Sequence, residues 1–156
     1  MKKIFAILIS IIMIFSVLPV TVFAENNKTI VSETIEYLDD GSYIVTTLVE
    51  ETNVTRATST KTGSKTAIHY NSDDEKVVTM KLTATFSYTG SSATCTAAST
   101  SYTIHDDSWK VTTATASKSG NKATGNFTVK HYVLLVPIQT VNTTITITCS
   151  NSGTLS

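Results

Sequence analysis

The chain has 156 residues, of which 12 are Lys or Arg and 12 are Asp or Glu, so its formal net charge at pH 7 is zero. Such a balance provides no extended basic face and therefore argues against nucleic-acid binding. The length suits one domain once a short leader is removed.

The first 24 residues have the pattern of a secretory signal peptide. Lys2 and Lys3 precede the apolar run IFAILISIIMIFSVLPV, and the segment ends in Val22-Phe23-Ala24, which places small residues at the −3 and −1 positions. We therefore expect cleavage after Ala24 and a secreted, extracellular protein. The alternative is an uncleaved membrane anchor, which we disfavour because polar residues and a proline interrupt the run.

Residues 25–51 are predicted to form an acidic β-hairpin around the turn signal DDGS at 39–42. Seven acidic residues lie in this segment against Lys28 alone. Two interpretations stay open: a solvated hairpin, which we favour, or an acidic pro-segment that is removed near Arg56. Residues 52–64 are polar and show no periodicity, so we interpret them as a linker.

Residues 65–156 are predicted to form an all-β domain of about six strands. In KVVTMKLTATFSYTG apolar and polar residues alternate, so that the apolar positions share one face of a strand. These positions are Val78, Met80, Leu82, Ala84, Phe86 and Tyr88. Turn signals at 71–75, 89–92, 119–121 and 134–137 separate the strands. Many short strands with turns between them favour a β-sandwich.

The two cysteines are predicted to form one disulfide. Cys149 is in phase with the isoleucines of the last strand, and Cys95 is in phase with Ala97, so we expect both thiols inside. Closing this loop of 54 residues would contribute about 4 kcal/mol in an oxidising compartment. The spacing of Trp109 between them is partly similar to the immunoglobulin pin, in which a tryptophan packs on a disulfide. We expect an immunoglobulin-like sandwich without the immunoglobulin topology.

The stretch TIHDDSW, residues 103–109, gathers the side chains that an active site or a metal site would use. A metal built on His105, Asp106 and Asp107 would need ligands converging from different strands, whereas adjacent aspartates on a strand point apart. We therefore predict a turn. The chain has no G-x-S-x-G motif and no glycine-rich phosphate loop. We expect no enzymatic activity, no metal and no cofactor.

The stretch YVLLVPI, residues 132–138, is apolar where a hairpin should turn. One interpretation is a buried crossing between two sheets, which we slightly favour. The other is an exposed tip that contacts a partner or a membrane surface. On the second interpretation the contact residues are Leu134, Leu135 and Val136, with Tyr132 as an aromatic anchor.

The segments TRATSTKTGSKT, YTGSSATC, SWKVTTATASKSGNKATG and TITCSNSGTLS carry a resemblance that covers roughly residues 30–156. In them the chain resembles a group of small secreted all-β proteins of Gram-positive bacteria with unassigned function. The resemblance implies export and an all-β body, and it transfers no catalytic residue.

These observations predict a secreted, non-enzymatic binding protein of the bacterial exterior. Its partner would be a protein, a glycan or a component of the cell envelope. The alternative is a secreted membrane-active toxin or antimicrobial protein that uses an apolar hairpin tip, and a third hypothesis is a structural surface protein without a specific ligand.

Overall fold

The computed structural model describes residues 27–52 and 59–156. The predicted signal peptide with its cleavage site at Ala24, and the predicted processing site at Arg56, lie outside the described residues. Within the described part of the chain, all regular structure is β-strand and there is no helix.

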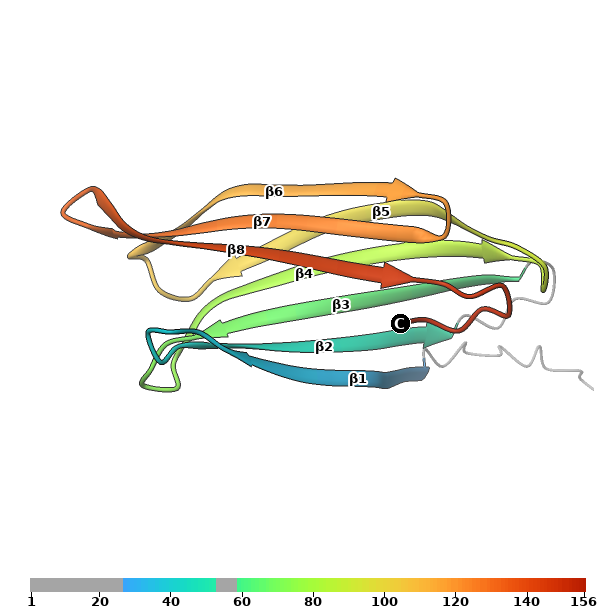
Figure 1. The fold of residues 1–156 in the computed structure, drawn as a ribbon, viewed down its shortest axis with the longest axis horizontal. Coiled ribbons are helices and arrows are strands. Elements are labelled where there is room, and N and C mark those ends of the chain that lie inside the picture. Colours follow the sequence, from blue (N-terminus) through green and yellow to red (C-terminus); the bar gives the residue numbers. More distant parts are fainter. Residues whose placement is uncertain (1–26, 53–58) are drawn as a thin grey trace, which may run out of the picture.

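Eight strands form two antiparallel sheets that pack face to face (Figure 1). The larger, sheet A, has the order β1-β2-β3-β4-β5, and the smaller, sheet B, has the order β6-β7-β8. The strands are β1 (Asn27–Tyr37), β2 (Tyr43–Thr52), β3 (Thr60–Tyr70), β4 (Lys76–Tyr88), β5 (Ala93–Ile104), β6 (Trp109–Ser119), β7 (Lys122–Val133) and β8 (Val136–Thr148). The prediction of an all-β, sandwich-like fold is confirmed.

The alternation predicted for β4 places its apolar face in the core. The five residues from Val78 to Phe86 on this face are all buried, and Tyr88 is half-buried at the end of the strand. Sheet B supplies the opposite wall of the core with Phe127, Val129, Ile145 and Ile147. In β4 the alternation of apolar and polar residues therefore determines which side of the strand faces inward.

Every hydrogen-bonded pair of strands is also consecutive in the sequence. The described strands therefore form two meanders joined by the β5–β6 connection, whereas an immunoglobulin domain uses Greek-key connections. This agrees with the expectation of a sandwich without the immunoglobulin topology.

The acidic hairpin is part of sheet A. β2 pairs with β3 from Tyr43 to Glu51, and its Ile44 and Leu48 are buried in the same core as the later strands. The linker predicted for 52–64 is shorter in the structure, because β2 includes Thr52 and β3 begins at Thr60. Residues 62–64 pair with β2 on one side and β4 on the other, which their composition did not indicate.

One expectation about the inward faces is wrong. Phe86 pairs with Cys95 and Thr85 pairs with Ala97, so Thr96 is an additional residue that forms a β-bulge. The alternation reverses there, and Ala97 is exposed whereas Cys95 is buried.

The C-terminal segment closes one end of the core. Cys149 forms an isolated β-bridge with Leu155, and the Leu155 side chain is buried against β3 at Gly63. A Cβ atom on Gly63 would lie 2.5 Å from Leu155 Cδ1, so glycine permits this contact.

We expect Leu155→Ala to lower the free energy of unfolding by about 2–5 kcal/mol, because it leaves a cavity at the end of the core. Denaturant unfolding measures this change. Leu135→Ala is the matched control, since that leucine is exposed and its truncation should change stability by about 0.5 kcal/mol or less. Equal effects of the two substitutions would contradict the burial of Leu155.

Candidate functional site

Four turns lie together at one end of the molecule, which we call the hairpin end (left in Figure 1). They are the turns 38–42, 71–75, 105–108 and 134–135, which join β1–β2, β3–β4, β5–β6 and β7–β8. Consecutive antiparallel strands bring alternate turns to the same end, so residues far apart in sequence become neighbours there.

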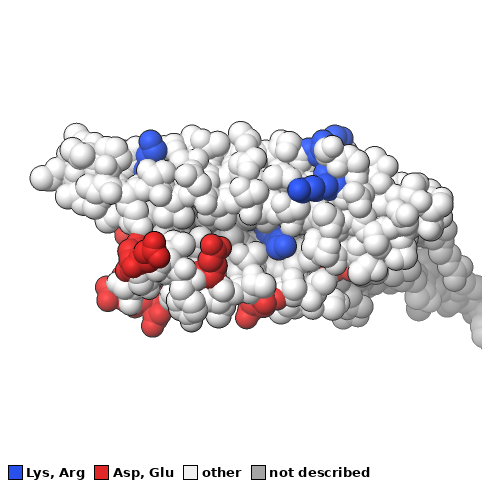
Figure 2. Space-filling view, in the orientation of Figure 1, with Lys and Arg blue, Asp and Glu red and all other residues white. Residues whose placement is uncertain are grey.

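The β7–β8 turn projects farthest and exposes two leucines. Leu134 is 92% exposed and Leu135 is 87% exposed, and Val133 pairs with Val136 to close a two-residue turn between them. The interpretation of this run as a buried crossing between sheets is therefore wrong, and the run forms an exposed tip. In Figure 2 the projecting end carries no charged side chain on the face shown.

The backbone of this turn is unusual for its residues. Leu134 has φ of 48° and Leu135 has φ of 71°, the left-handed conformation at both central positions of a two-residue hairpin loop. Asn-Gly is the common solution for such a turn, because leucine in this conformation brings Cβ close to the backbone. The tip therefore combines unfavourable backbone conformation with unfavourable exposure.

The predicted contact residues divide into two groups. Leu134, Leu135 and Val136 lie at the exposed tip, where Ile138 is exposed as well. Tyr132 lies nearer the body and is half-buried, with Lys110 Nζ 5.1 Å from the centre of its ring. Lys130 pairs with Lys110 across β6 and β7, so a tyrosine and two lysines lie behind the tip on the outer face of sheet B.

At the base of the tip Trp109 packs between two histidines. Its ring stacks on His131 with centroids 4.7 Å apart and meets the edge of His69 at 5.1 Å. The partial similarity in spacing to the immunoglobulin pin does not extend to the position of the tryptophan. Trp109 begins β6, whereas both cysteines lie beside the other end of that strand, about 30 Å away at ~3.3 Å per residue.

Below the tryptophan, polar side chains join the β1–β2 turn to β3 and β8. Asp40 accepts hydrogen bonds from the Ser42 amide and hydroxyl at 3.0 and 2.6 Å, and from the Gln139 side chain. The buried His69 places Nε2 3.1 Å from Ser42 Oγ. These residues, with Asn71, Ser72, Asp106, Trp109 and His131, line a pocket of about 210 Å³.

This order of contacts differs from that of a hydrolase triad. The Ser42 hydroxyl donates to Asp40, so His69 Nε2 is the donor to Ser42 rather than a base acting on it. Burial lowers the pKa of His69, against a smaller opposing effect of Asp40. No sequence pattern indicates this group, because its members are separated by up to 99 residues.

The TIHDDSW segment is a turn, as predicted. Asp106 accepts hydrogen bonds from the Ser108 hydroxyl at 2.7 Å and the Ser108 amide at 2.9 Å, and the first of these is the main cause of its lowered pKa. His105 Nε2 lies 2.9 Å from Thr79 Oγ1. In residues 27–52 and 59–156 no three His, Cys, Asp or Glu side chains are arranged to hold a metal ion.

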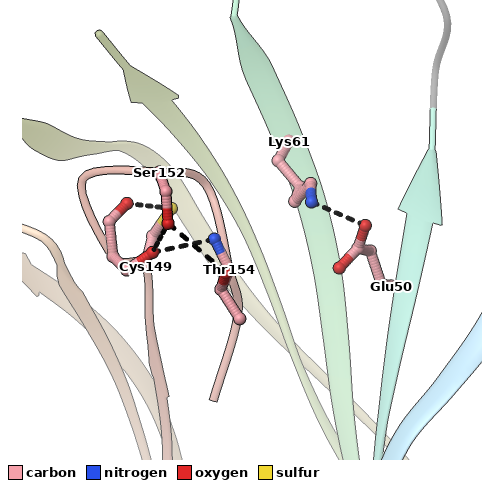
Figure 3. A network of polar contacts seen from close by, with 6 residues as sticks. Glu50, Lys61, Cys149, Ser152 and Thr154 are labelled. Carbon is pink, nitrogen blue, oxygen red and sulfur yellow. Dashed lines mark hydrogen bonds and ion pairs between the residues drawn. The ribbon is translucent and has the colours of Figure 1, made fainter. Parts of the chain in front are cut away.

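The two cysteines lie at the opposite end of the sandwich. The Cys95 amide donates to Gly120 O at 2.7 Å and the Cys149 amide donates to Asn121 O at 3.0 Å, so the two residues flank the β6–β7 turn. Both thiols are buried and free in the structure, and burial raises the pKa of each. Figure 3 shows Cys149 in the C-terminal loop near the Lys61–Glu50 ion pair.

Comparisons with protein-family models, with curated proteins and with solved structures found no match. No helix in the described part of the chain is both long and apolar enough to cross a membrane.

His69 makes a testable contribution to pH dependence. Because its pKa is lowered from 6.5 in the folded protein, the folded state disfavours the protonated ring. This contribution to stability is present above pH 6.5 and is lost as the pH falls below it. We expect the free energy of unfolding to decrease from pH 7.5 to pH 5, and His69→Gln to flatten that decrease.

Denaturant midpoints at each pH measure this dependence. His105→Gln is the control, since His105 is exposed and should leave the slope nearly unchanged. A slope that survives in His69→Gln would show that another group causes it.

Proposed function

We propose that this chain is a secreted, non-enzymatic binding protein of the bacterial exterior that contacts its partner through the β7–β8 tip. The single observation that carries the proposal is the tip itself, where Leu134 and Leu135 are both exposed and both in the left-handed conformation. Asn-Gly is the common polar sequence for a two-residue turn of this kind, and this chain has two leucines there instead.

An apolar tip of this kind suits an anchor. It projects beyond the rest of the hairpin end, so it meets a partner first. Burying each leucine would contribute about 1.5–3 kcal/mol, and interface energy usually concentrates in a few such side chains. The tip suits three kinds of partner: an apolar pocket in a protein, an apolar site on a glycan-bearing surface, or another component of the cell envelope.

A membrane-active toxin or antimicrobial protein is the second candidate. The observation in its favour is the tyrosine with Lys110 and Lys130 behind the tip, since aromatic and basic residues are common at a lipid interface. Against it, the three other turns at the hairpin end carry seven acidic residues, which anionic lipid would repel. We therefore place partner binding first.

Replacing Leu134-Leu135 by Asn-Gly separates folding from binding. We expect this variant to be more stable by about 1–2 kcal/mol, because Asn-Gly suits the turn, and to lose binding. Binding is measured by sedimentation with whole Gram-positive cells and, separately, with vesicles of phosphatidylglycerol and phosphatidylcholine.

Ile30→Asn is the matched control, because Ile30 is 66% exposed but lies in β1, away from the tip. Binding to cells alone supports the first candidate, and binding to vesicles supports the second. An Asn-Gly variant that binds like the parent protein would refute the role of the tip in both.

We also propose that Cys95 and Cys149 become a disulfide after export. Both are buried, both flank the β6–β7 turn, and they are close enough that charge on Cys95 raises the pKa of Cys149. The bond would link β5 of sheet A to the end of β8 in sheet B.

Thiol labelling of the unfolded, unreduced secreted protein tests the bond, and we expect neither cysteine to react. Reduction should then lower the free energy of unfolding by about 4 kcal/mol. Labelling of both cysteines without reductant would exclude the disulfide.

A further inference from the structure

β1 is an open sheet edge with unusual exposure. Among the described strands it contacts only β2, and its side chains from Lys28 to Tyr37 are exposed on both faces. Four of them are large and apolar: Ile30, Val31, Ile35 at 53% exposure and Tyr37 at 75%. A long, exposed edge strand without proline leaves backbone N–H and C=O groups free to pair with another strand.

The other sheet edges are covered to a greater extent. β5 and β6 lie against each other where the two sheets meet, and a backbone hydrogen bond joins Cys95 to Gly120 there. β8 lies over β3 and β4 of sheet A. β1 extends past sheet B at the lower side of the molecule, with no strand in front of it (Figure 1).

We propose that β1 pairs antiparallel with β1 of a second copy of this chain, about a two-fold axis at Ile35, and joins two five-stranded sheets into one of ten strands. Self-pairing of this kind is isologous, so the same residues meet on both sides. The proposal is independent of the function assigned to the tip.

The charges of the β1 side chains, and the face of sheet A on which each side chain lies, select this register. From Ser32 onward β1 pairs regularly with β2, and Glu33, Ile35 and Tyr37 share the outer face of sheet A. A two-fold axis between two residues would oppose inner and outer side chains, which a ladder does not allow. An axis at Glu33 or Glu36 would place like charges directly opposite each other.

An axis at Thr34 avoids like charges, but it sets Glu33 against Ile35 and Tyr37 against the bulged Val31. An axis at Ile35 sets isoleucine against isoleucine, Glu33 against Tyr37, and Thr34 against Glu36. No like charges meet, and both glutamates face side chains that can donate a hydrogen bond.

The Ile35 register also continues an aliphatic row that the structure already contains. Ile35 pairs with Val45, and Val45 pairs with Ile68, all on the outer face of sheet A. In the dimer this row runs through both copies and covers the two exposed Ile35 side chains. The register also brings Lys28 of each copy toward the acidic β1–β2 turn of the other.

Sedimentation equilibrium of the purified protein, with its disulfide state held constant, measures the dimer. We expect a mass twice that of the chain at high concentration and half that mass in Ile35→Lys, which would place two positive charges on the axis. Ile30→Lys is the matched control, since Ile30 is exposed on the same strand but lies beyond the bulge, and this variant should remain dimeric. A parent protein that is monomeric throughout would overturn the proposal.

Cross-linking tests the register even if Ile35→Lys fails to fold. Residues opposite each other on an antiparallel dyad have Cα atoms about 4.5–5.5 Å apart, which suits a disulfide. We expect Ile35→Cys to form a covalent dimer on mild oxidation and Glu36→Cys not to do so, while the buried Cys95 and Cys149 stay out of reach. Equal cross-linking of both variants, or of neither, would exclude the Ile35 register.

Discussion

The burial of one face of β4 is the constraint on which the rest of the structure depends. Its inward residues, from Val78 to Phe86, pack against β7 and β8 of sheet B, while β3 and β5 pair along both of its edges. A slip of one residue would move the whole apolar row to the solvent side, so this strand fixes the register of its neighbours. The turns at both ends, including the tip, take their positions from that register.

The alternation of apolar and polar residues predicted the long strands well. It failed at the β-bulge, where an extra residue reverses which side chains face inward. β4 fills the interval between the predicted turns at 71–75 and 89–92, and β5 begins directly after the second of these turns. The bulge at Thr96 was not predictable, since it depends on how β5 fits against β4. The similarity of the Trp109 spacing to the immunoglobulin pin did not extend to its packing, because spacing does not say which end of a strand a residue occupies.

The candidate site was predictable only in part, for a similar reason. The residues of the tip were identified from their composition, but whether sheet A covers them is a long-range property that local pattern does not contain. The Asp40, Ser42 and His69 group joins a turn to a distant strand, and each residue alone looks like an ordinary polar side chain. Conversely, TIHDDSW contains the residue types of an active site but forms a turn, which a hydrogen bond from Ser108 to Asp106 stabilises.

The meander topology has a consequence for how the chain folds during synthesis. Within each sheet every strand after the first pairs with the one before it, so each strand except β1 and β6 finds its partner already in place as it emerges. The loop that each hairpin closes contains few residues, so its entropic cost is low and the hairpin forms rapidly. Sheet A completes first, and its inner face on β4 stays exposed to solvent until β7 and β8 arrive, so that interval is when the chain is most prone to aggregate.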